Sequence, residues 1–386
     1  MQIYLDHSAT TPPRPEVIAA MQAVLSQEWG NPSSLHHWGS RAATWVERAR
    51  LQVAELIQAE RSESIVFTSG GSEADNLALM GVARRYTEPQ HLIISSVEHS
   101  AVSEPAKLLA QWGWQVTRLA VDRTGRVDPD ELKAALQPNT ALVSIIYGQS
   151  EVGTLQPIQA LGEICREAGV LFHTDAVQVA GRIPLDVRLL PVDLISLSSH
   201  KLYGPQGAGA LYVRPGVELV PLIQGGSQEG GLRSGTQAVP AIAGFGVAAA
   251  LAQQDLSEPA DELHRLIQLR DRLFEKLQVM PELQPTGNRL HRLPHHVSFC
   301  VESVSGRTLV RHMDLAGIAV SSGSACNSGK LNPSPVLKAM GYNDRQATGA
   351  LRLTLGRSTT VEDIDWTAQV LQQVLSRLLP VAAVCS

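Results

Sequence analysis

The sequence has little charge of one sign, no long apolar run and no paired cysteines. A net charge of −5 over 386 residues, without a long basic run, argues against a dedicated nucleic-acid-binding or membrane-surface protein. Met1 to Asp6 lack the basic and apolar regions of an export signal, and the apolar run at 241–252 is too short and glycine-broken to span a bilayer. We therefore expect a cytoplasmic protein that contacts neither membranes nor nucleic acid directly.

The four cysteines, Cys165, Cys300, Cys326 and Cys385, are scattered along the chain without paired spacing. This pattern indicates neither a disulfide framework nor a zinc site, and we expect no metal. Cys165 lies in an apolar helical pattern and Cys300 in a strand pattern, so both are predicted to be structural. A cysteine with a chemical role would act singly.

What the sequence does have is a regular alternation of strand and helix patterns from residue 64 onward. Strand patterns alternate with helical patterns, which predicts crossover connections, a mostly parallel sheet and ligands at the carboxyl ends of its strands. A second, smaller α/β unit is expected to begin near residue 280. The expected strands cover residues 65–68, 92–95, 115–120, 141–146, 170–173, 194–197, 297–301 and 351–355, and the expected helices cover residues 15–27, 72–85, 101–112, 129–136, 158–168, 240–253, 259–279 and 361–379.

Lys201 lies in the stretch Asp193 to Val213, where a buried strand pattern ends among small residues. The glycines that follow, up to Gly209, are interpreted as a loop. A lysine partly desolvated there, beside hydroxyls and an imidazole, would have a lowered pKa and could attack an aldehyde. The resulting Schiff base points to pyridoxal phosphate as the cofactor. A solvated surface lysine is the alternative.

The stretch Thr68-Ser-Gly-Gly-Ser-Glu73 follows a strand pattern and precedes a helical one. Its glycines let the backbone approach a ligand, so the amides at the helix start and the Ser72 hydroxyl would form a phosphate cradle around Gly71. A Gly-Ser turn that only caps the helix is the alternative.

Two further strand ends carry side chains that could bracket a cofactor ring. His99 could stack on the ring and move protons, or could simply cap a helix. Asp175 could pair with a protonated pyridine nitrogen and so keep the ring an electron sink, or could be a helix N-cap. Gln178, three residues further on, could hydrogen-bond the ring oxygen.

Two residues of the second unit have predicted roles toward a substrate. Cys326 lies in the small, polar, glycine-rich run Ser321 to Ser334, which predicts a mobile loop and a nucleophilic rather than structural cysteine. Arg352 opens an apolar strand and would bind the carboxylate of an amino-acid substrate. A salt bridge from Arg352 to a protein carboxylate is the alternative.

Together these residues resemble the cysteine desulfurases of the fold-type I, class V aminotransferase group, in the branch with a long active-site loop. The resemblance covers nearly the whole chain. It rests on the motifs Tyr4-Leu-Asp-His-Ser-Ala-Thr-Thr-Pro12, Gly30-Asn-Pro-Ser-Ser-Leu-His36, Ser198-Ser-His-Lys-Leu-Tyr-Gly-Pro205, Gly231-Leu-Arg-Ser-Gly-Thr236, Ser321-Ser-Gly-Ser-Ala-Cys326 and Leu355-Gly-Arg357.

The resemblance implies an α/β, fold-type I pyridoxal-phosphate-dependent transferase. A large domain at 15–257 would hold a mostly parallel seven-stranded sheet, and a small domain of residues 1–14 and 258–386 would carry the cysteine loop at about 321–335. It also implies a homodimer that converts L-cysteine to L-alanine and transfers the sulfur to Cys326 as a persulfide, for iron–sulfur cluster or thio-cofactor biosynthesis. A sulfur-acceptor or iron–sulfur scaffold protein would be its partner.

By the same resemblance, Lys201 would form the Schiff base, His99 would stack on the ring and move protons, and Arg352 would bind the substrate carboxylate. The implied cofactor-binding residues are Gly71, Ser72, His99, Ser150, Asp175, Gln178, Ser198, His200, Lys201 and, from the partner subunit, Thr236.

The chain departs from the family pattern at a few positions. Ser150 stands where an asparagine is usual, Gly71-Ser72 where Ala-Thr is common, and Gly230 where an arginine is common. These changes bear on cofactor affinity and partner contacts rather than on reaction type. The alternative functions are a lyase acting on cysteine, cystine or selenocysteine that frees its product directly, and a sulfur-delivery component with low activity of its own.

Overall fold

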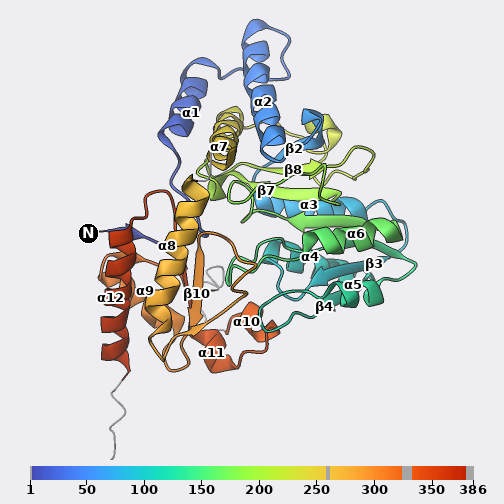
Figure 1. Cartoon of the computed structure of the whole chain (residues 1–386). Coiled ribbons are helices and arrows are strands. Elements are labelled where there is room, and N and C mark those ends of the chain that lie inside the picture. The colour runs from blue at the N-terminus through green and yellow to red at the C-terminus, as the bar shows by residue number, and fades with distance from the viewer. Residues whose placement is uncertain (1, 258–260, 324–332, 380–386) are drawn as a thin grey trace, which may run out of the picture.

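The computed structural model describes residues 2–257, 261–323 and 333–379, and a mostly parallel β-sheet lies at its centre (Figure 1). Among these residues the sheet has seven strands in the order β2-β8-β7-β6-β5-β3-β4. Strand β8 runs antiparallel to both of its neighbours, β2 and β7, while the pairs along β7-β6-β5-β3-β4 are parallel. This confirms the predicted α/β class. The strands are β2 (Ile65–Thr68), β3 (His91–Ser95), β4 (Gln115–Leu119), β5 (Thr140–Ser144), β6 (Leu171–Asp175), β7 (Leu194–Ser198) and β8 (Gly209–Val213).

The prediction that the glycine run up to Gly209 forms only a loop is wrong at its end. Gly209 is the first residue of β8, where it pairs with Thr68 on one side and Ser198 on the other. A Cβ at Gly209 would come within 2.5 Å of the carbonyl carbon of Gly70, so glycine is required by the close approach of two backbones. A glycine that the sequence pattern assigns to a loop is in fact part of a strand, packed against a neighbouring backbone.

Helices cover both faces of the sheet because successive strand residues point to opposite faces. In β3, Leu92 and Ile94 belong to the apolar core under α3 (Gly71–Ala83) and α4 (Ser100–Gln111), whereas Ile93 belongs to the core on the other face. That second core is formed with α1 (Pro15–Gln27), α2 (His37–Leu56), α5 (Pro129–Ala135), α6 (Ile158–Ala168) and α7 (Val239–Ser257).

Helix α7 contains the apolar run at 241–252 and packs against α1 and α2. Within the described ranges, no helix is both long enough and apolar enough to cross a bilayer.

A second unit lies beside the large sheet, at the lower left of Figure 1, and has its own apolar core. Its antiparallel sheet has the order β12-β10-β9, and β1 pairs in parallel with β11, so the first residues of the chain join this C-terminal unit. The separate core supports our proposed division into residues 15–257 and residues 1–14 with 258–386. The unit contains β1 (Ile3–Tyr4), α8 (Asp261–Gln278), β9 (Gln284–Pro285), β10 (His296–Cys300), α9 (Gly306–Leu315), β11 (Ile318–Ala319), α10 (Pro335–Ala339), α11 (Asp344–Thr348), β12 (Ala350–Thr354) and α12 (Val361–Leu378).

Candidate active site

Two adjoining cavities lie at the carboxyl ends of the parallel strands. The smaller, of about 90 Å³, is lined by eight of the predicted residues: Gly71, Ser72, His99, Ser150, Asp175, Gln178, Ser198 and His200. The larger, of about 550 Å³, is lined by Lys201 and Arg352 together with His99 and Ser150, which border both cavities. The fold therefore brings most of the predicted site residues together from distant parts of the chain.

Lys201 ends the short 3-10 turn η2 (Ser199–Lys201) that follows β7. Its Nζ donates hydrogen bonds to the carbonyl oxygens of Ser8 at 2.6 Å and Ala9 at 2.7 Å. The Ser8 backbone is held in turn by Thr354, whose Oγ1 accepts from the Ser8 amide at 2.9 Å. The N-terminal segment thus directs the lysine ammonium group toward the cavity, between the two units.

Asp175 is the last residue of β6 and is 5% exposed. Its Oδ1 accepts a hydrogen bond from the Val177 amide at 2.9 Å, within a turn rather than at the start of a helix. Burial raises the pKa of Asp175, while nearby His99, the Val177 amide and Lys201 act to lower it. The carboxyl is therefore placed where a cationic group in the small cavity would stabilise its ionised form.

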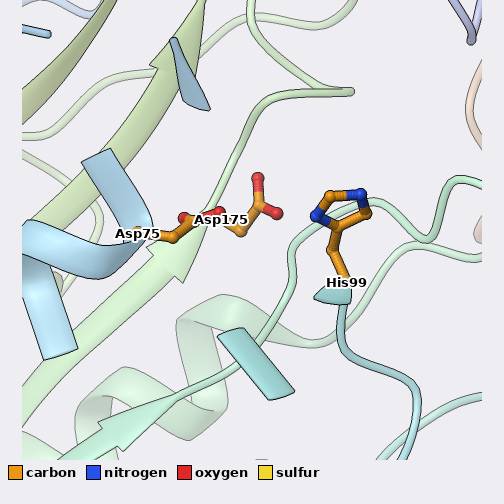
Figure 2. A group of neighbouring side chains, drawn as sticks. All are labelled: Asp75, His99 and Asp175. Atoms are coloured by element: carbon orange, nitrogen blue, oxygen red, sulfur yellow. The ribbon is translucent and has the colours of Figure 1, made fainter. Parts of the chain in front are cut away.

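His99 is the N-cap of α4, and its Nδ1 accepts a hydrogen bond from the Ala101 amide at 3.2 Å. A neutral His99 ring accordingly carries its proton on Nε2. Figure 2 shows the His99 ring beside the Asp175 carboxylate. One side chain therefore both caps a helix, which was the alternative role of His99, and lines the small cavity.

The phosphate cradle is predicted at the start of α3, beside the small cavity. Ala74 donates the first bond of the helix, to the Gly70 carbonyl at 3.1 Å, and no side chain of a described residue caps the preceding amides. Ser198 and His200 line the same pocket. Burial, and secondarily Lys201, lower the pKa of His200 to about 4, so its imidazole is neutral at neutral pH. The amides and these side chains present uncharged donors to an anion.

Arg352 is 4% exposed and forms the salt bridge that was its alternative role. Its Nη2 donates to Asp6 Oδ1 at 2.8 Å, and its Nη1 donates to the Ser150 carbonyl at 3.0 Å. Its Nε is buried and has no hydrogen-bond partner among the described residues. The pair fixes the guanidinium at the cavity wall without using all five of its N–H donors.

The sequence of this chain matches a known protein family. The model of the aminotransferase class-V family matches residues 3–366. The chain belongs to this family. Among curated proteins it is 46% identical over 379 residues to the cysteine desulfurase IscS of Dictyoglomus turgidum, covering 98% of this chain and 95% of that protein. It is 45% identical over 384 residues to the IscS of Pseudomonas entomophila, with 98% and 94% covered.

Solved structures agree with this assignment. A NifS-like protein superposes with a TM-score of 0.91 at 35% identity, over 98% of this chain and 100% of that one. SspA in complex with cysteine superposes with a TM-score of 0.81 at 34% identity, over 92% and 99%. The expectations of a class V aminotransferase fold and of a pyridoxal-phosphate-dependent enzyme are thereby confirmed.

One predicted residue that the structure describes, Thr236, lines neither cavity. Thr236 is exposed on the segment that follows the 3-10 turn η3 (Glu229–Gly231). Cys326 lies outside the described residues. Cys165 and Cys300 are both buried, as predicted, and burial raises their thiol pKa values to about 12 and about 11.

Three carboxyl groups at the site were not predicted: Asp75, Glu98 and Glu151. Asp75 lines the small cavity, and the two glutamates line the large one. Burial raises the pKa of Glu98 to about 8 and that of Glu151 to about 7. Their positions in the sequence could have revealed them, since each of these carboxyl groups lies within a few residues of a predicted motif. Acidic residues that hold a proton near neutral pH are candidates for functional groups.

Proposed function

We propose that this protein is a cysteine desulfurase that converts L-cysteine to L-alanine and receives the sulfur on Cys326. The observation that carries the proposal is the placement of Lys201, His99 and Arg352 around one cavity, beside a smaller pocket that contains Asp175. The relatives support it, since two of those named above are cysteine desulfurases and one is SspA with cysteine.

The residues that line the small pocket support pyridoxal phosphate as its ligand. A Cβ added at Gly71 would come within 2.7 Å of Val177 Cγ2 and 3.4 Å of Ser198 Cβ, so glycine leaves open the space beside the amides of α3. Asp175 would meet the ring nitrogen and His99 would cover the ring face. The remaining proposed contacts are Gly71, Ser72, Ser198 and His200 to the phosphate and Ser150 and Gln178 to the ring oxygen. Bound through Lys201, the cofactor would supply an electron sink for the substrate carbon.

The substrate would lie in the large cavity, where the chain's own residues orient it and move its protons. Arg352 would bind the carboxylate with the donors that Asp6 and the Ser150 carbonyl leave available. Lys201 would take up the α-proton and return a proton to the product. His99, with its proton on Nε2 when neutral, would donate to the departing carbon fragment or accept from the incoming thiol.

The sulfur transfer exchanges one bond for another. The Cys326 thiolate attacks the substrate sulfur, a sulfur–sulfur bond forms and the carbon–sulfur bond breaks. The electron pair of the broken bond stays with the carbon fragment, which gains a proton and leaves as alanine. Cys326 then carries the sulfur as a persulfide, so the thiol and cysteine have become the persulfide and alanine without an added oxidant.

We further propose that the enzyme is a homodimer in the cytoplasm. Thr236 is exposed and borders neither cavity of its own chain, which supports a role toward the phosphate in the partner subunit. The persulfide would pass to a sulfur acceptor or iron–sulfur scaffold protein, in line with the similarity to IscS proteins.

A single-turnover assay with L-cysteine tests the proposal. We expect Cys326→Ala to retain bound cofactor, measured by its visible absorbance, but to lose persulfide formation and nearly all alanine release. The matched control Cys165→Ala removes a buried thiol away from both cavities and should keep both products. Wild-type release of alanine and free sulfide by Cys326→Ala would instead establish a lyase, and alanine formation only after an acceptor protein is added would establish a partner-dependent sulfur-delivery protein.

A further inference from the structure

A second buried carboxyl, that of Asp75, lies next to Asp175 in the smaller cavity. Asp75 comes from the second turn of α3, Asp175 from the end of β6 and His99 from the start of α4, and one donor atom from each lies within 4.8 Å of the others. Figure 2 shows Asp175 placed between the other two side chains. Asp75 is 1% exposed, and its Oδ1 has no hydrogen-bond partner in the described part of the chain.

Two carboxyl groups so close and so buried cannot both be ionised at low cost. The surroundings distinguish between them. His99, Lys201 and the Val177 amide all favour the ionised form of Asp175. The proton therefore belongs on Asp75 rather than on Asp175.

Apart from His99, which also faces Asp175, the described groups that act on the charge of Asp75 include no cation. His173 Nε2 lies 3.6 Å from Asp75 Oδ1, but burial lowers the pKa of His173 to about 3, so this imidazole is neutral. Ser196 contributes a neutral hydroxyl, while Asp175 and Glu98 add negative charge or the potential for it. Burial, and then Asp175, raise the pKa of Asp75 well above its usual range.

We propose that Asp75 is a positioning residue that stays protonated and leaves the single negative charge of the pocket on Asp175, where a cationic ring nitrogen would bind. A neutral Asp75 acts through Asp175, because it supplies a polar neighbour without a competing charge. The identity of the bound ring rests on the proposed function, whereas the protonation of Asp75 does not.

The first experiment uses the cofactor-free full chain and measures thermal unfolding from pH 5 to pH 8. A folded-state pKa above the unfolded value gives stability that is present at low pH and lost as the pH rises. Asp75→Asn removes this loss, so its melting temperature relative to the wild type should rise with pH. The melting temperature of the control Glu73→Gln, on the same helix, should not rise with pH relative to the wild type, because Arg233 and Ser69 lower the pKa of Glu73. A pH-independent difference for Asp75→Asn would overturn the proposal.

The second experiment measures the dissociation constant of pyridoxal phosphate and the pH titration of the bound cofactor's absorbance near neutral pH. Asp75→Asn introduces a neutral, polar side chain. Its dissociation constant for pyridoxal phosphate should lie within about twofold of the wild-type value, and the absorbance of its bound cofactor should titrate at the same pH. Asp75→Leu should bind the cofactor about tenfold more weakly. Equal weakening of both variants, a shifted titration in Asp75→Asn, or wild-type binding by Asp75→Leu would contradict the assigned role. Failure of the wild type to bind the cofactor would refute the proposed function, while the unfolding experiment would still decide the state of Asp75.

Discussion

Arg352 Nη2 donates a hydrogen bond to Asp6 Oδ1 at 2.8 Å, joining residues 346 positions apart in the chain. Both residues lie where the N-terminal segment passes beside β12, and the isolated bridge between Asp6 and Thr354 keeps them in register. The ion pair and the proposed substrate contact are therefore not exclusive roles. Asp6 holds the arginine fork in place at the cavity that Arg352 lines.

Arg352→Lys should raise the KM for L-cysteine at least about tenfold, with a smaller change in kcat, because a lysine lacks the planar fork that contacts Asp6 and the Ser150 carbonyl and would bind a carboxylate with two donors. Asp6→Asn should raise KM less, since the fork remains. Steady-state alanine release measures both. The control Arg272→Lys, in an exposed pair with Asp365, should leave KM unchanged. An unchanged KM in Arg352→Lys would exclude the substrate contact.

Gly71→Ala should weaken the binding of pyridoxal phosphate, because the new methyl group would meet Val177 Cγ2 at 2.7 Å and one of them must shift into the pocket. Val177 contacts the added atom through a side chain rather than through backbone. The double variant Gly71→Ala with Val177→Ala should therefore recover most of the affinity. Fluorescence titration of the four proteins gives the coupling. If the losses of affinity in the two single variants simply added in the double variant, the contact with Val177 would not be the reason that glycine is needed at position 71.

Glu229→Gln should lower the free energy of unfolding by about 3–5 kcal/mol, since it leaves the buried Arg50 guanidinium without its buried charge partner. Glu229 receives Arg50 Nη1 at 2.6 Å and Nη2 at 2.9 Å and also accepts from the Phe67 amide at 2.8 Å, which ties the segment carrying Thr236 to β2. Urea denaturation measures the loss. Glu47→Gln, at the exposed side of Arg50, should cost about 1 kcal/mol or less.

The Glu229 pair also gives a pH dependence of defined sign. Burial acts to raise the pKa of Glu229, but Arg50 and the other donors outweigh it and lower the pKa below the usual value. The stabilisation is therefore present above the unfolded-state pKa and lost as the pH falls. The difference in stability between wild type and Glu229→Gln should shrink in acid, and a difference that grows there would contradict this account.

Glu151 should make cysteine binding depend on pH near 7. Burial raises its pKa to about 7, and Ser334 Oγ donates to its Oε2 at 2.6 Å. As the pH rises from 6 to 8, Glu151 ionises close to Arg352 and competes with the substrate carboxylate. We expect the KM of the wild type to rise more steeply over this range than that of Glu151→Gln. Parallel KM profiles for the two proteins would show that Glu151 does not titrate in the cavity.

The sequence was sufficient to predict most of the fold and many of the residues that line the two cavities. Residues 65–68, 92–95 and 115–120 read as strands because apolar and β-branched residues cluster between turn signals, and each lies within a residue or two of its observed strand. The sequence did not reveal β8. Gly209 looks like a turn residue, but glycine is required there because the Gly70 backbone lies so close.

Other features were decided by the tertiary structure alone. Asp175, Gly71 and Lys201 could be proposed from the chain because strand ends and helix starts are local patterns that place side chains at one edge of a sheet. The pairing of Arg352 with Asp6, the carbonyls of Ser8 and Ala9 at Lys201, and the raised pKa of Asp75 depend on which distant segments meet and exclude water. Burial and charge at such contacts are sums over the folded neighbourhood, so no local run of residues encodes them.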